Sequence, residues 1–123
     1  MADERMGRLR EICAELPGVA EGITVHHPSF KIGKKAFVMV TDGGPDQALW
    51  MKSDRGTQAE LVASDPDLYF VPPYVGHHGW VGVRVGPGVD WTEVSELVTD
   101  AYRAAAPKRL LAQFDSSHPG PRG

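Results

Sequence analysis

Residues 27–37 read HPSFKIGKKAF and have the pattern of two short strands joined by a tight turn. Gly33 and Lys34 separate two stretches that suit extended backbone. Glycine in the first central position favours a type II′ turn, whose twist matches that of paired strands. The segment therefore predicts a β-hairpin with strands at 29–32 and 35–40 and its tip at the Gly33-Lys34 pair.

Further strands are predicted on both sides of this hairpin. Residues 23–51 are rich in β-branched and aromatic residues broken by turn formers, which favours an antiparallel meander. Residues 80–85, WVGVRV, alternate valines with other residues, which places Arg84 on the less apolar face. The remaining strands are predicted at 24–27, 48–51 and 68–71.

Three helices are predicted around these strands. Apolar residues recur at helical spacing over residues 6–16, and a short second helix can begin after Ser53 or Asp54. The last helix has the clearest start, because Asp90 and Glu93 have the spacing of a reciprocal capping box. Three helices on one face of an antiparallel sheet of about five strands would bury the apolar stripes, which is an α+β fold.

The length of 123 residues suits one domain with its own hydrophobic core. Pro107 should end or kink the last helix. Residues 116–123, SSHPGPRG, have too few apolar side chains to fold alone. We therefore expect a single domain over residues 1–115, followed by a flexible C-terminal tail.

The composition predicts a cytoplasmic protein. No apolar stretch approaches the length of a membrane span, and the N-terminal residues lack the apolar run of a signal peptide. The single cysteine cannot form an internal disulfide, which fits a reducing compartment. A net charge of -3 argues against broad attraction to nucleic acid or membrane, but it leaves room for a local basic patch.

No motif predicts catalysis, a metal site or a cofactor. The pairs His26-His27 and His77-His78 could supply imidazole ligands. However, neighbouring strand residues point to opposite faces, and no second cysteine or ordered carboxylate spacing completes a site. Cys13 lies in the apolar stripe of the first helix, where a thiol is usually buried and inert. The glycine-rich turns lack P-loop or dinucleotide-fold spacing. We expect no enzyme activity and no bound cofactor.

Basic residues are better organised than the net charge suggests. Lys31, Lys34 and Lys35 bracket the predicted hairpin tip, and Lys108 and Arg109 follow the last helix. Lysines clustered on a hairpin can follow a phosphate backbone, and they can equally protect a strand edge from aggregation. The cluster is the most informative polar feature of the sequence.

Aromatic residues and two histidines gather in one proline- and glycine-rich stretch. Tyr74, His77, His78 and Trp80 lie in or beside it. Most such rings belong to a core, but beside a glycine-rich loop they can also line a groove for a small flat ligand or an apolar peptide. These four residues therefore form an alternative ligand site, with a histidine as its polar group.

Four segments resemble the MmcQ/YjbR family in their order and their motifs. They are LPGVAEG at 16–22, HPSFKIGKKAF at 27–37, DPDLYFVPPYVGHHGWVGVRV at 65–85 and AYRAAAPKRL at 101–110. The resemblance implies an α-β-β-β-α-β-β-α fold, similar to that of type III secretion chaperones. It also implies a DNA-binding role through a double wing.

On this sequence the first implied wing is the hairpin at 31–35, and the second ends on the strand that carries Trp80 and Arg84. The resemblance supplies no reaction, substrate or cofactor. The nucleic-acid-binding residues that it implies are Lys31, Lys34, Lys35, Arg84, Lys108 and Arg109.

Two functions compete on this evidence. The first is a DNA-binding or nucleic-acid-associated regulatory module, whose binding to DNA should be weak and dependent on salt. The second is a small-molecule or peptide-binding domain that uses the aromatic groove between Tyr74 and Trp80. An enzyme ranks third, and we expect no membrane partner.

Overall fold

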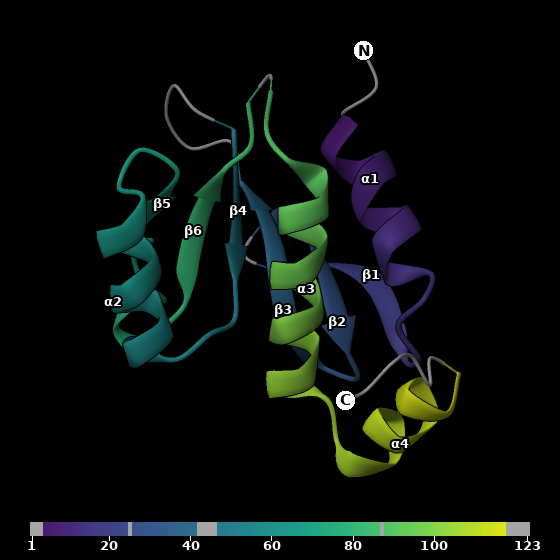
Figure 1. The fold of residues 1–123 in the computed structure, drawn as a ribbon. Coiled ribbons are helices and arrows are strands. Elements are labelled where there is room, and N and C mark those ends of the chain that lie inside the picture. The colour runs from purple at the N-terminus through teal and green to yellow at the C-terminus, as the bar shows by residue number, and fades with distance from the viewer. Residues whose placement is uncertain (1–3, 25, 42–46, 87, 118–123) are drawn as a thin grey trace.

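The computed structural model describes residues 4–24, 26–41, 47–86 and 88–117 (Figure 1). The elements, in chain order, are α1 (Glu4–Cys13), β1 (Val19–Thr24), β2 (His27–Ile32), β3 (Lys35–Thr41), β4 (Ala48–Met51), α2 (Arg55–Ser64), β5 (Tyr69–Phe70), the 3₁₀ turn η1 (Gly76–His78), β6 (Val81–Arg84), α3 (Trp91–Ala105) and α4 (Lys108–Ser117).

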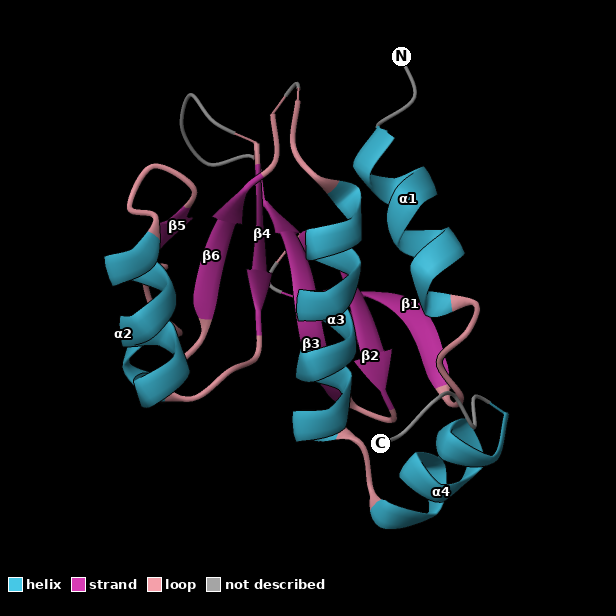
Figure 2. Ribbon diagram, viewed as in Figure 1, coloured by secondary structure: helices cyan, strands magenta, loops and turns pink. Residues whose placement is uncertain are grey.

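The strands form one antiparallel sheet in the order β1-β2-β3-β4-β6-β5. Helices α1, α2 and α3 lie on the same face of this sheet, and α4 lies beyond its lower edge (Figure 2). The predicted α+β class, with helices on one face of an antiparallel sheet, is therefore confirmed. In the described part of the chain the sheet has six strands instead of about five, and four helices replace the three that were predicted.

The predicted hairpin is present, with one irregularity that the sequence did not reveal. Ile32 pairs with Lys35 across the turn, and Gly33 has φ 62°, as the turn requires. Further along, Phe30 pairs with Val38 but its neighbour pairs with Ala36, so β3 carries one extra residue in a β-bulge. The bulge falls at Phe37, and both Phe37 and Val38 are fully buried.

The predicted strand at 24–27 is wrong, because Thr24 ends β1 and pairs with His27, which begins β2. The backbone of His26, between them, has a φ of 68°. Composition missed the true strand because Ala, Glu and Gly at positions 20–22 are poor strand formers. Tertiary contacts compensate: Arg10 of α1 forms an ion pair with Glu21.

Helix α4 was not predicted, since the segment after Pro107 was interpreted as a helix end. Pro107 does separate two helices, and its carbonyl accepts hydrogen bonds from the amides of Leu110 and Leu111. The ring of Phe114 then packs against Tyr102, with ring centroids 5.7 Å apart. Residues 118–123 of the predicted tail lie outside the described residues.

The last predicted helix begins as expected but only half of its capping box forms. The side chain of Asp90 accepts hydrogen bonds from the amides of Thr92 and Glu93. Among the described residues, the carboxylate of Glu93 accepts a hydrogen bond from the hydroxyl of Tyr69 at 2.5 Å, and it makes no reciprocal bond to the amide of Asp90. A tertiary contact thus replaces a local one.

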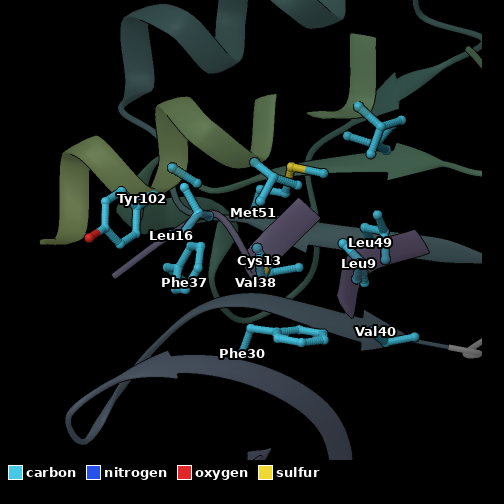
Figure 3. Packing of buried hydrophobic residues seen from close by; sticks show 14 of the residues in the cluster. Leu9, Cys13, Leu16, Phe30, Phe37, Val38, Val40, Leu49, Met51 and Tyr102 are labelled. Carbon is cyan, nitrogen blue, oxygen red and sulfur yellow. The ribbon is translucent and has the colours of Figure 1, made fainter. Parts of the chain in front are cut away.

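The hydrophobic core lies between the sheet and the helices (Figure 3). Phe30, Phe37 and Leu49 contribute from the sheet, and Leu9 contributes from α1. Tyr102 of α3 is fully buried, and its hydroxyl donates a hydrogen bond to the carbonyl of Pro17 at 2.6 Å. This bond fastens the end of α3 to the connection between α1 and β1.

Arg5 is the largest fully buried side chain of the core. Its guanidinium donates hydrogen bonds to the carbonyl of Thr41 at 2.9 Å and to that of Ala48 at 3.1 Å. Thr41 ends β3 and Ala48 begins β4, so one side chain joins α1 to two strands. Nothing in the sequence pattern distinguished this arginine from those on the surface.

We predict that Arg5→Ala lowers the free energy of unfolding by about 3 kcal/mol, because two buried carbonyls lose a charged donor. Urea denaturation followed by circular dichroism measures the change. Arg103→Ala is the matched control, since it removes an exposed ion pair with Asp115 and a contact with the Phe114 ring, and it should cost far less. Equal losses in the two variants would contradict the role of Arg5.

Cys13 gives a second prediction, because its side chain is only 7% exposed and burial raises the pKa of its thiol to about 12. A thiol reagent should therefore react slowly with the native protein up to pH 9 and rapidly in denaturant. Cys13→Ser should lower the free energy of unfolding by about 1 kcal/mol, from the buried hydroxyl. Equal reaction rates in native and denaturing buffer would place the thiol on the surface.

Candidate functional site

Two connections of the chain lie at the same end of the sheet. Strands β3 and β6 both pair antiparallel with β4, so they run in the same direction and start at the same end. The Gly33-Lys34 turn precedes β3, and residues 71–80 precede β6. Residues 52–55, which follow β4, lie there too. We call this region the lysine end; it lies at the lower ends of the strands in Figure 1.

Four of the five lysines of the sequence lie at or beside this end. Lys34 and Lys35 are exposed at the hairpin tip. Lys52 follows β4, and its amide donates a hydrogen bond to the carbonyl of Phe37. The hairpin tip and Lys52 therefore sit on adjacent strand ends.

The other two lysines are Lys31 and Lys108. The backbone of Lys31 lies near the end of β2, but its side chain extends along β1 away from the hairpin tip, because a Cβ placed on Gly22, which pairs with Ser29, would lie 3.2 Å from its side-chain carbons. Lys108 begins α4, with Arg109 beside it. Leu110 of the same helix contacts Gly18, which directly precedes β1. The predicted residues Lys34, Lys35, Lys108 and Arg109 thus lie at or beside one end, where Lys52 joins them, whereas the side chain of Lys31 leads away from it.

Two carboxylates, Asp54 and Asp100, lie beside Lys52 and carry the opposite charge. A cavity of about 160 Å³ is lined by Lys52, Asp54 and Asp100, among others. Asp54 is occupied as the N-cap of α2, where it accepts a hydrogen bond from the amide of Thr57 at 2.8 Å. That bond lowers the pKa of Asp54, so this carboxylate is charged at neutral pH.

Negative charge gathers at the opposite end of the sheet. A cavity of about 330 Å³ between the start of α3 and strands β5 and β6 is lined by Asp65, Asp67, Asp90 and Glu93, among others. Burial and the neighbouring Glu93 raise the pKa of Tyr69 at the base of this cavity, so the phenol keeps its proton. The net charge of -3 therefore hides a division between a lysine-rich end and a carboxylate-rich end.

Arg84 lies at this carboxylate-rich end and not with the lysines, because it is the last residue of β6. Its guanidinium lies 4.7 Å from the centre of the Phe70 ring and donates hydrogen bonds to the carbonyls of Pro66 and Asp67. These contacts hold the connection between α2 and β5. They give Arg84 a structural role that the alternation of the strand could not predict.

Residues 71–80 form a loop that we call the β5–β6 loop. Tyr74 is 85% exposed and has φ 68°, whereas Trp80 is only 9% exposed. His77 and His78 are exposed, with ring centroids 3.9 Å apart, because they follow each other in a 3₁₀ turn and not in a strand. The expectation that their side chains point to opposite faces is therefore wrong.

We compared four cavities in the described part of the chain with the predicted aromatic groove. None of these four is lined by Tyr74, His77, His78 or Trp80. The two largest are the carboxylate-rich cavity and one of about 370 Å³ between α1, α3 and Phe114. Among the described residues, no three His, Cys, Asp or Glu side chains gather as a metal site would require. None of the described helices is both long and apolar enough to cross a membrane.

Comparison with known proteins gives relatives in fold and in sequence. The chain is 34% identical over 62 residues to the uncharacterized protein Rv2570 of Mycobacterium tuberculosis and, equally, to the uncharacterized protein Mb2600 of Mycobacterium bovis. These matches cover 50% of this chain and 47% of each relative, so the chain spans about half the length of the relatives it matches.

The fold is similar to the crystal structure of Deinococcus radiodurans protein DR2400, a DUF419 domain. The TM-score is 0.69 at 20% identity, over 89% of this chain and 86% of that one. The sequence model of the YjbR family matches residues 14–104. Because this match covers well over half of the chain, and includes the hairpin and the β5–β6 loop, the protein belongs to the YjbR family.

Proposed function

We propose that this protein binds DNA, and that its lysine end contacts the phosphate backbone. The observation that carries the proposal is the placement of four of the five lysines, Lys34, Lys35, Lys52 and Lys108, at or beside one end of a chain whose net charge is -3. Ammonium groups act as point charges toward phosphates, and their attraction does not depend on base sequence. Binding should therefore be weak, reversible and nonspecific.

The geometry of the hairpin supports this role. Lys34 is exposed in the two-residue turn and Lys35 directly after it, and the strands on either side are paired with β1 and β4, so the charges are carried by a short, constrained projection. The β5–β6 loop projects at the same end. The two connections would act as the double wing that the family resemblance implies, with the hairpin supplying most of the charge.

The carboxylate-rich end supports the proposal by orienting the molecule. The carboxylates that line the cavity at this end lie away from the lysines; they are Asp65, Asp67, Asp90 and Glu93. The carboxylate-rich end would therefore repel a polyanion, and the lysine end would attract it. A groove for a small molecule has less support, because Trp80 is 9% exposed and the Tyr74 side chain is 85% exposed to solvent. Two residues at such different depths do not form the walls of one groove.

The test removes charge at the hairpin without reversing it. For about three phosphate contacts, affinity for a labelled duplex should fall roughly 40-fold between 50 and 200 mM salt, from a slope near -0.9 per contact. In Lys34→Gln/Lys35→Gln the slope should flatten by about 0.9 for each lysine removed. Fluorescence anisotropy across the salt range measures both effects.

A charge-matched control separates a local site from the effect of net charge. Gly7→Glu/Ala63→Glu also lowers the net charge by two, at exposed positions of α1 and α2, and the space around Gly7 is open. This variant should bind as the wild type does. Absence of binding at the lowest salt, or equal affinity of the wild type and the glutamine variant, would refute the proposed function.

A further inference from the structure

Tyr74 is exposed in a backbone conformation that a tyrosine rarely adopts. The protein has three tyrosines, of which Tyr69 and Tyr102 are 2% and 0% exposed, whereas Tyr74 is 85% exposed with φ 68°. A positive φ strains any residue with a large side chain, and such strain is retained mainly where it serves a function. An asparagine or glycine would fit this position with less strain. The ring itself is therefore the feature that needs an explanation.

The loop that carries Tyr74 is held in place by α2. Arg55 donates hydrogen bonds to the carbonyl of His77 at 2.7 and 3.0 Å, and Gln58 donates to the carbonyls of Gly76 at 2.9 Å and Trp80 at 2.6 Å. These bonds fix the C-terminal half of the loop. The tyrosine is thus presented on a braced turn.

Gly76 and Gly79 let the loop pack closely, because a side chain at either position would clash with neighbouring atoms. A Cβ on Gly79, whose φ is 91°, would lie 2.7 Å from backbone atoms of Asp54 and Arg55. A Cβ on Gly76 would lie 2.5 Å from the side chain of Val71. Close approach at both glycines leaves the loop little freedom to turn Tyr74 inward, so its exposure is imposed by packing.

The position of the loop relates the tyrosine to the lysines. Val38 of β3 and Val81, the first residue of β6, both pair with Met51 of β4, so these two residues lie level and about 10 Å apart, two strand spacings. Lys35 begins β3, and the β5–β6 loop leads into β6. A nucleic acid whose phosphates lie on the hairpin lysines would therefore have bases within reach of the loop.

We infer that Tyr74 is a stacking platform for an unpaired base, and that the lysine end prefers single-stranded to double-stranded DNA. The inference rests on the proposed function and specifies its ligand. An aromatic ring can stack on a base only where that base has a free face, and in a duplex both faces are covered by neighbouring base pairs. Proteins that bind single strands combine aromatic rings, on which bases stack, with positively charged surfaces that follow the phosphate backbone.

The first test compares strand types in Tyr74 variants. Anisotropy titrations should use oligothymidine of about 12 nucleotides, a length within known single-strand site sizes, and a duplex of equal length. Wild type and Tyr74→Phe should prefer the single strand. Tyr74→Ala should bind the single strand roughly tenfold more weakly, in line with the loss of one stacked base, and its duplex affinity should be unchanged.

Two controls exclude a loss of fold. Tyr74→Gly removes the ring and also relieves the positive φ, so its melting temperature should equal or exceed that of the wild type while its single-strand affinity falls. Ile23→Ala shortens another exposed apolar side chain, 69% exposed, which lies in β1, outside the loop. It should leave single-strand affinity unchanged.

A chemical footprint tests the contact independently of affinity. Tetranitromethane should nitrate Tyr74 first, because the other two tyrosines are buried. Saturating oligothymidine should slow the nitration of Tyr74, as located by peptide mass spectrometry, and the duplex should not. The duplex arm distinguishes stacking from simple coverage by a nearby phosphate backbone.

The outcomes separate this inference from the proposed function. If Lys34→Gln/Lys35→Gln weakens DNA binding while Tyr74→Ala binds oligothymidine as the wild type does, the stacking role is wrong and the lysine contact stands. Equal affinity of the wild type for single strand and duplex would also overturn it. If the wild type binds neither form of DNA, the proposed function itself fails.

Discussion

The arrangement of the whole molecule depends on the pairing of one short strand, β4. Its four residues, Ala48–Met51, pair on one side with β3 and on the other with β6. This pairing joins the N-terminal hairpins to the C-terminal β5–β6 unit. Because both neighbours run antiparallel to β4, they run parallel to each other, and the turns that precede them must lie at one end. Two segments distant in sequence thereby share a surface.

The strand and helix types were largely readable from the sequence, because they depend on local patterns. Gly33 marked the hairpin turn, and Asp90 marked the start of α3. The failures share a cause, which is that tertiary contacts outweighed local preference. Residues 20–22 form a strand through their pairing with β2, and the bulge at Phe37 leaves two consecutive residues of β3, Phe37 and Val38, buried. Only α4 had a readable pattern that was overlooked, in the spacing of Leu110 and Phe114.

The candidate site was only partly predictable for a related reason. The hairpin lysines are neighbours in sequence, so their proximity was evident, but Lys52 reaches the same end only through strand pairing. Arg84 appeared equivalent to them until its contacts with Phe70 and the carbonyls of Pro66 and Asp67 were visible. Backbone strain left no trace in the sequence at all. Tyr74 was noted as one aromatic residue among several, and its exposure of 85% and its φ of 68° distinguish it.

Net charge is a poor guide to the partner of a protein whose charges are divided in this way. Strand β3 has seven residues, so the two ends of the sheet lie about 20 Å apart at 3.3 Å per residue. Screening by 0.1 M salt acts over about 10 Å. A phosphate group at the lysine end therefore experiences the lysines together with Asp54 and Asp100 beside Lys52, and the carboxylates around the cavity at the other end are largely screened. An excess of negative charge on the whole chain is thus compatible with an end that attracts a polyanion.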